Sequence, residues 1–131
     1  MIFVDTSAFY ALMDGDDAEH SRALKYWQGQ PPDERGLVTT NYVVLESMAL
    51  LQSRLGMSAV RSFRDAILPI IRIEWIDEAV HAQAVSAFIA ADRRGLSLVD
   101  LSSFETMRNL GVRSVFTFDR HFDRYGFETV P

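Results

Sequence analysis

Acidic side chains follow two apolar segments that are predicted to be strands. Asp5 directly follows the segment 1–4, and Asp119 directly follows the segment 114–118. In open α/β sheets, ligands bind at the carboxyl ends of the strands. A third carboxylate, Asp100, lies at a predicted junction between a loop and a helix. We therefore expect these three carboxylates to approach one another at one edge of the sheet.

A fourth carboxylate, Glu46, is the only charged residue in the stretch 41–51, which is apolar almost throughout. A helix that is apolar on every side is buried, and a lone carboxylate on it needs a partner. No cationic residue lies within one helical turn of Glu46. Its partner must therefore come from elsewhere in the fold or be a metal ion.

Carboxylates that share a crevice repel one another, so they are stable in the ionised state only with cations between them. The sequence has no cysteine, and its three histidines (His20, His81 and His121) show no metal-ligand spacing. We interpret them as surface or capping residues, with His121 close enough to Asp119 to be a secondary contact. Oxygen ligands of this kind favour one or two Mg²⁺ or Mn²⁺ ions. Such a site suits metal-assisted hydrolysis of a phosphodiester.

Each of these carboxylates also has a purely structural interpretation. Asp5, Asp100 or Asp119 could cap the helix that follows it, because aspartate is a preferred N-cap residue. Glu46 could pair with a buried arginine. These alternatives stay open for each residue taken singly, but they do not explain why all four residues fall at one edge of the predicted sheet.

The elements that must position these side chains alternate between strand and helix. Strands are predicted at 1–4, 36–39, 71–75, 114–118 and 127–130, and helices at 7–13, 16–27, 40–56, 58–68, 77–95 and 102–110. This alternation predicts an α/β fold with a mainly parallel sheet. The first strand is apolar throughout, as a central strand is, whereas the strands at 71–75 and 127–130 alternate as edge strands do.

Capping residues predict where several of these helices begin. Thr40 and Asp77 stand in N-cap positions, and two pairs have the spacing of a capping box: Asp16 with Glu19 and Ser102 with Glu105.

The chain of 131 residues, of which 48% are hydrophobic, suits a single domain over 1–131. The nearest candidate for a linker, residues 28–33, is too short to separate domains and is interpreted as a surface loop. A net charge of −5 excludes a polybasic nucleic-acid binder. The sequence shows neither a signal peptide nor an apolar run that could span a membrane, so a cytoplasmic location is expected.

Four segments of the chain together resemble the PIN-domain ribonucleases, and within them the VapC-type toxins of bacterial toxin–antitoxin pairs. The segments are Ile2–Ala8 (IFVDTSA), Thr39–Glu46 (TTNYVVLE), Leu96–Asp100 (LSLVD) and Phe116–Phe122 (FTFDRHF). Any one segment is a weak signal. Their order and spacing match along essentially the whole chain, which makes the set specific.

The resemblance implies a three-layer α/β/α sandwich around a mainly parallel five-stranded sheet in the order 3-2-1-4-5. It also implies a divalent-metal-dependent endoribonuclease. By position, Asp5 and Asp100 would be the firmest metal ligands. Asp119 would assist directly or through water, and Glu46 would hold or tune the metal or its water.

Further residues are assigned supporting roles by the same resemblance. Ser7 and Thr117 stand where small hydroxyl residues often support the site. Many relatives carry an acidic residue where this chain has His121, and this departure blurs the assignment of Asp119 against Asp123, which we expect to be exposed. For Arg120 we favour contact with RNA.

The resemblance further implies an RNA substrate, a homodimer, and a cognate antitoxin that blocks the acidic crevice. The sequence does not identify the RNA. The main alternative is a PIN-like domain that binds RNA or a protein without cleaving anything. Such a domain would be expected to have lost some of the acidic residues, and all four are present.

Overall fold

The computed structural model describes residues 1–29 and 36–131. Most of the loop expected at 28–33 lies outside the described residues. Within them, no helix combines the length and the apolar character that crossing a bilayer requires.

Five parallel strands form one sheet in the order β3-β2-β1-β4-β5. The strands are β1 (Ile2–Val4), β2 (Leu37–Thr40), β3 (Arg72–Glu74), β4 (Ser114–Phe116) and β5 (Glu128–Val130). Every residue of β1 is buried, whereas β3 and β5 are partly exposed edges. The predicted strand order, the central first strand and the two edge strands are therefore confirmed. Because all strands run the same way, their carboxyl ends share one edge of the sheet.

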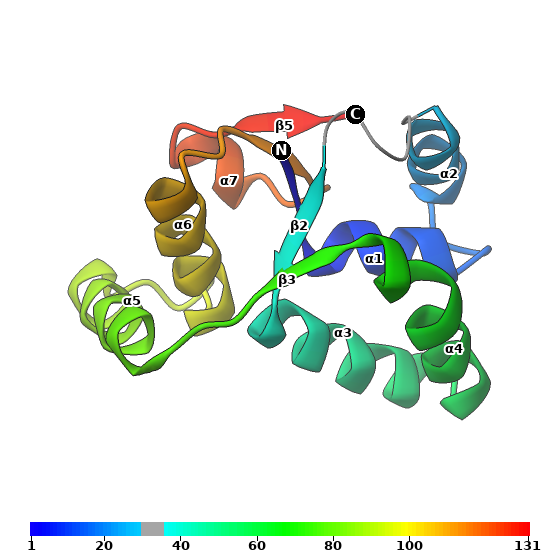
Figure 1. Ribbon diagram of the computed structural model, residues 1–131, viewed down its shortest axis with the longest axis horizontal. Coiled ribbons are helices and arrows are strands. Elements are labelled where there is room, and N and C mark those ends of the chain that lie inside the picture. Colours follow the sequence, from blue (N-terminus) through cyan, green and yellow to red (C-terminus); the bar gives the residue numbers. More distant parts are fainter. Residues whose placement is uncertain (30–35) are drawn as a thin grey trace.

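Helices cover both faces of this sheet. They are α1 (Thr6–Met13), α2 (His20–Gln28), α3 (Asn41–Arg54), α4 (Met57–Ser62), α5 (Glu78–Ala91), α6 (Leu98–Leu110) and α7 (His121–Arg124). Figure 1 shows α5 and α6 to one side of the strands and α1, α2 and α4 to the other. The predicted helix 58–68 is interrupted: a π-helical turn at 63–67 and a 3₁₀ turn at 68–70 follow α4.

Aromatic packing fixes α6 against α7, the two helices that bracket the candidate site. Phe104 of α6 and Phe122 of α7 are fully buried, with their rings edge to face at 5.0 Å. The Phe104 ring also stacks on Tyr125 and Phe127. Truncating a buried phenylalanine of this kind typically costs about 3–5 kcal/mol, so this cluster holds the two helices in a defined relation.

Two of the four predicted helix starts are confirmed. The Thr40 hydroxyl accepts a hydrogen bond from the Val43 amide at 3.1 Å, and Asp77 Oδ1 accepts one from the Val80 amide at 3.0 Å. Both side chains therefore satisfy amide groups that have no partner inside the helix.

The predicted capping box of Asp16 with Glu19 is wrong, because α2 begins only at His20. Asp14 and Asp17 each accept a hydrogen bond from the backbone amide two residues later, at 2.9 and 2.8 Å. Aspartates that bind their own backbone in this way favour turns over helix. The segment is therefore a turn up to Glu19.

The predicted capping box of Ser102 with Glu105 is also wrong, and the helix begins four residues earlier. Ser97 Oγ accepts a hydrogen bond from the Asp100 amide, and Asp100 Oδ2 accepts one from the Ser97 amide, both at 3.0 Å. Ser102 lies inside the helix, where its hydroxyl donates to the Val99 carbonyl. Both serine pairs have the same spacing, and Ser97 comes first along the chain. Asp100 therefore lies in the first turn of α6.

Candidate active site

Asp5 lies between the end of β1 and the start of α1. Its carboxylate is buried, and Oδ2 lies 3.0 Å from both the Ser7 and the Thr117 hydroxyl oxygens, which donate to it. Burial raises the pKa of Asp5 from its ordinary value of 3.8 to about 6; the two hydroxyl hydrogen bonds oppose the rise, and the charge of Asp100 adds to it. Asp5 also caps α1 through the Ser7 amide, so the capping interpretation holds alongside its place in the site.

The hydroxyl groups of Ser7 and Thr117 join the ends of two adjacent strands. Their oxygens lie 3.0 Å apart. The Phe118 amide donates to Ser7 Oγ at 2.9 Å, and the Asp119 amide donates to Thr117 Oγ1 at 3.0 Å. The loop that carries Asp119 is therefore fastened to the end of β1.

Asp100 faces the same edge of the sheet from the first turn of α6. Burial raises the pKa of its carboxyl group, the Ser97 amide lowers it, and the negative charge of Asp119 raises it again. The capping box with Ser97 holds the carboxylate through Oδ2. The capping interpretation was therefore correct in part, since Asp100 belongs to the cap but Ser97 is the N-cap residue.

Asp119 and His121 complete a compact group with Asp100. The His121 amide donates to Asp119 Oδ1 at 2.9 Å. The His121 Nδ1 atom lies 3.0 Å from Asp119 Oδ1 and 3.7 Å from Asp100 Oδ2, yet it makes no hydrogen bond of normal geometry. One ligand atom from each of the three residues lies within 4.8 Å of the others. Asp119 bonds to the amide of the first residue of α7, whose N-cap residue is Arg120.

Glu46 approaches this group from α3. Burial raises its pKa, and the charges of Asp100 and Asp119 raise it further. The Thr6 side chain opposes the rise, although its hydroxyl makes no hydrogen bond of normal geometry. The prediction that the helix carrying Glu46 is buried on every side is wrong, because Leu45 of α3 is 71% exposed. No ion pair joins Glu46 to an arginine within residues 1–29 and 36–131.

The remaining predicted residues lie at the rim. Arg120 and Asp123 are both exposed and line a hollow of about 550 Å³ together with Thr117 and Asp119. Asp123 is outside the compact group. His121 was predicted to be only a secondary contact, whereas the structure brings its ring into the compact group with Asp100 and Asp119. The only signal for it was its position two residues after Asp119, because the turn into α7 brings the ring back over that carboxylate.

The charges of the site call for a cation. Asp5, Glu46 and Asp100 all have raised pKa values, in each case partly because another carboxylate is near. No lysine or arginine of the described chain forms an ion pair with any of the four predicted carboxylates. Hard oxygen donors without a cationic partner are the ligand set that Mg²⁺ and Mn²⁺ prefer.

Comparisons with known proteins show the family and the fold of this chain. The PIN domain profile matches residues 2–128. The 23S rRNA-specific endonuclease VapC20 of Mycobacterium tuberculosis is 35% identical over 131 residues, covering 99% of this chain and 98% of its own. The crystal structure of VapC20, described as a sarcin–ricin loop cleaving toxin, superposes with a TM-score of 0.88 over all of both chains. FitAcB of Neisseria gonorrhoeae, at 18% identity, has a TM-score of 0.73 and covers 100% of this chain and 97% of its own, which shows the shared fold.

Proposed function

This chain belongs to the PIN-domain family, and from that premise we propose that it is a metal-dependent endoribonuclease acting as the toxin of a toxin–antitoxin pair. The observation that carries the proposal is the convergence of Asp5, Glu46, Asp100 and Asp119 at the carboxyl edge of the sheet. The charge of Asp100 raises the pKa of Asp5 and of Glu46, and the charge of Asp119 raises the pKa of Glu46 and of Asp100, which supports their forming one site. Full-length similarity to a named endonuclease supports the same activity.

We propose that the substrate is the sarcin–ricin loop of 23S ribosomal RNA. VapC20 is described as cleaving that loop, and it matches this chain over nearly the whole length of both. The match extends over essentially the whole of both chains, which supports carrying the substrate over from VapC20.

A divalent cation, Mg²⁺ or Mn²⁺, fits the donor set of the site. By the family resemblance, Asp5 and Asp100 would hold it, Asp119 would assist directly or through water, and Glu46 would hold or tune the metal or its water. His121 is close enough to Asp100 and Asp119 to contribute Nδ1. When bound, one or two such ions lower the pKa of water and offset charge on the phosphate oxygens.

The residues of this chain orient the acids and bind the substrate. Ser7 and Thr117 hold Asp5 through Oδ2, and Ser97 holds Asp100. Arg120 is exposed beside Asp119, where a guanidinium group can bind a phosphate oxygen of the RNA. Arg120 and Asp119 line the same hollow, which supports a role for Arg120 in binding the substrate beside the acids.

We also propose that residues 1–131 form one PIN-like domain, that the protein acts in the cytoplasm as a homodimer, and that a cognate antitoxin covers the acidic crevice. The antitoxin and the dimer are inferred from the family. A PIN-like module that only binds RNA or a protein is the alternative. The presence of all four acidic residues supports the nuclease over this alternative.

Mapping the cut ends on purified bacterial ribosomes tests the proposed substrate. We expect a single break in 23S RNA within the sarcin–ricin loop, visible as one new end by primer extension. Breaks scattered over 16S and 23S RNA, or a single break elsewhere, would contradict the assignment of the substrate. Intact RNA after incubation with metal-loaded protein would favour the binding module.

A further inference from the structure

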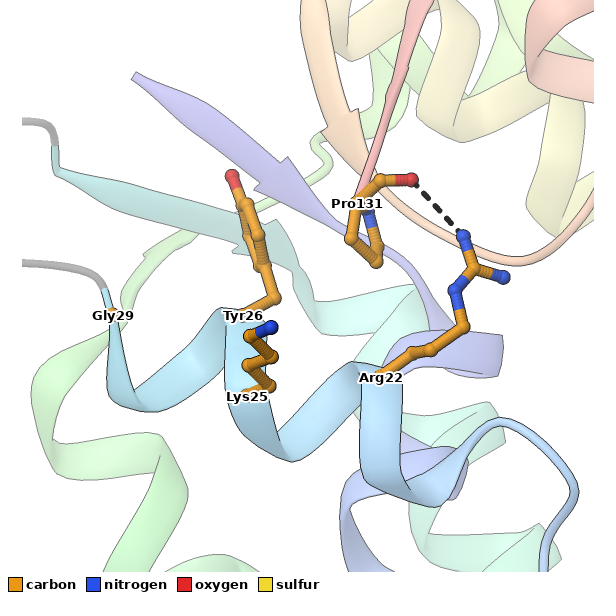
Figure 2. A pocket seen from close by; sticks show the side chains of 5 residues that line it. All are labelled: Arg22, Lys25, Tyr26, Gly29 and Pro131. Carbon is orange, nitrogen blue, oxygen red and sulfur yellow. Dashed lines mark hydrogen bonds between the residues drawn. The ribbon is translucent and has the colours of Figure 1, made fainter.

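Two hollows adjoin beside the acidic group. The first, of about 550 Å³, includes Thr117 and Asp119 and extends to Arg22 and Pro131. The second, of about 450 Å³, begins at the same Arg22 and Pro131 and continues along α2 past Lys25. Figure 2 shows the second hollow, with Tyr26 and Pro131 on opposite sides and Arg22 at one end. Because they share Arg22 and Pro131, the two hollows lie next to each other, and together they form a track that leads from Asp119 to α2.

Arg22 is held in place at the junction of the two hollows. Its guanidinium group donates to Glu19 Oε2 at 2.9 Å and to the main-chain oxygen of Pro131 at 3.4 Å, and it lies 5.6 Å from the centre of the Phe118 ring. Exposed ion pairs contribute little stability. The main consequence of these contacts is therefore that the Arg22 guanidinium group is held in a defined orientation.

The track carries an excess of positive charge. Its cations are Arg22, Lys25, Arg120 and Arg124, and its acids are Glu19, Asp119 and Asp123. Asp119 belongs to the proposed metal site, so the cations outnumber the remaining acids four to two. Only Arg22 of these cations is engaged in an ion pair within the described parts of the chain.

The second hollow combines two cations with an aromatic wall. Arg22 and Lys25 are three residues apart on α2, which places their Cβ atoms about 5–6 Å apart on one face of the helix. The Tyr26 ring packs on Phe116 of β4 with 4.8 Å between ring centres, so this wall is fixed to the sheet. Cations beside an aromatic ring are the combination that binds single-stranded nucleic acid.

We propose that the second hollow binds the sugar–phosphate backbone of the RNA that flanks the cleaved bond, with Arg22 and Lys25 contacting phosphates beyond those at the metal site. This inference rests on the proposed function and extends its substrate-binding surface to α2. An RNA strand fits better than an acidic peptide because the track is continuous with the carboxylates, where the scissile phosphate must lie. The same polyanion then occupies both hollows.

The test compares two RNAs that contain the sarcin–ricin loop, one ending at the stem and one with single-stranded extensions on both sides. Wild type, Lys25→Ala and the matched control Arg61→Ala are assayed on both. Arg61 is exposed on α4 and lines neither hollow. For Lys25→Ala we expect KM for the extended RNA to rise several-fold with kcat unchanged. The plot of log affinity against log salt should lose about 0.7 of its slope.

A second measurement uses the fact that Lys25 is the only lysine in the sequence. Acylation by an amine reagent, followed by mass spectrometry, should show Lys25 protected when the extended RNA is bound and reactive when RNA is absent, with the N-terminal amine as internal reference. Equal behaviour of Lys25→Ala and Arg61→Ala, or an unprotected Lys25, would overturn the inference. A Lys25→Ala variant that binds RNA normally but loses antitoxin binding would also overturn the inference. If the wild type cuts neither RNA, the proposed function fails instead.

Discussion

The Thr117 hydroxyl oxygen lies 3.0 Å from Asp5 Oδ2 across 112 residues of sequence. This contact bridges the carboxyl ends of two adjacent parallel strands and lowers the pKa of a carboxyl group that burial raises. The fold therefore brings the Asp5 carboxyl group together with the Thr117 hydroxyl, whose hydrogen bond favours the ionised form of that carboxyl group.

Replacing that donor should reduce activity at neutral pH. Thr117→Val keeps the shape of the side chain but removes the hydroxyl, so the pKa of Asp5 should rise above about 6 and less of the carboxylate should be charged. We expect cleavage to fall about 10- to 100-fold, as is usual for residues that orient a metal ligand. The acidic limb of the pH–rate profile should also move to higher pH.

Thr106→Val is the matched control for this change, because Thr106 is a buried threonine whose hydroxyl has no hydrogen-bond partner among the described residues. It should leave both rate and profile unaltered. An unshifted pH profile in Thr117→Val would show that the hydroxyl does not control Asp5.

Ionisation of Asp5 should destabilise the metal-free protein. Its folded pKa of about 6 is above its ordinary value of 3.8, so between these values the native state binds more protons than the unfolded state. The Asp5 contribution to the free energy of unfolding therefore decreases as pH rises through this window, by up to about 3 kcal/mol.

Asp5→Asn removes this titration. The stability of Asp5→Asn relative to wild type should be greater at pH 7 than at pH 4. The measurement is the free energy of unfolding of each protein by denaturant titration at both pH values with chelator. Added Mg²⁺ should stabilise the wild type more than the variant. A stability difference that stays constant with pH would contradict the raised pKa.

His121 should influence which metal is preferred. Its Nδ1 atom lies beside both Asp119 and Asp100, and an imidazole ligand suits Mn²⁺ better than Mg²⁺. We expect His121→Ala to weaken Mn²⁺ binding more than Mg²⁺ binding in titration calorimetry. His81→Ala, at a histidine that contacts Tyr42 instead, should change neither. Equal losses for both metals in His121→Ala would remove the imidazole from the metal site.

The two serines of α6 should differ in their effect on stability. Ser97→Ala removes the N-cap side chain and should cost about 1 kcal/mol in chemical denaturation. Ser102→Ala loses only a hydroxyl that bonds within the helix, so its cost should be smaller. A larger loss in Ser102→Ala would mean that the capping assignment is wrong.

The mainly parallel sheet, its central strand and its edge strands were predictable because the apolar pattern differs between a strand such as 1–4 and one such as 127–130. The full strand order came from the resemblance to the PIN-domain ribonucleases. Asp5 and Asp119 could be located because each follows a strand by a few residues, and parallel strands end together. Asp100 was identified from its place at a predicted junction between a loop and a helix and from the family resemblance. The start of its helix was misplaced because Ser97 and Ser102 both precede an acid by three residues.

Other features depend on tertiary structure that no local pattern reveals. The proximity of His121 to Asp100 requires α6 and α7 to pack through Phe104 and Phe122. The exposure of Leu45 shows that an apolar helix can still face outward when nothing in the described chain covers it.

The most direct test of a metal-dependent ribonuclease is cleavage of bacterial ribosomal RNA by the purified protein, with Mg²⁺ or Mn²⁺ and with chelator. Asp100→Asn and the control Asp123→Asn, an exposed acid of the same hollow, are run beside the wild type. We predict cutting by wild type and Asp123→Asn that chelator stops, and none by Asp100→Asn, which circular dichroism should show to be folded. Cutting that persists with chelator or in Asp100→Asn would contradict the account, as would a metal-bound wild type that leaves the RNA intact.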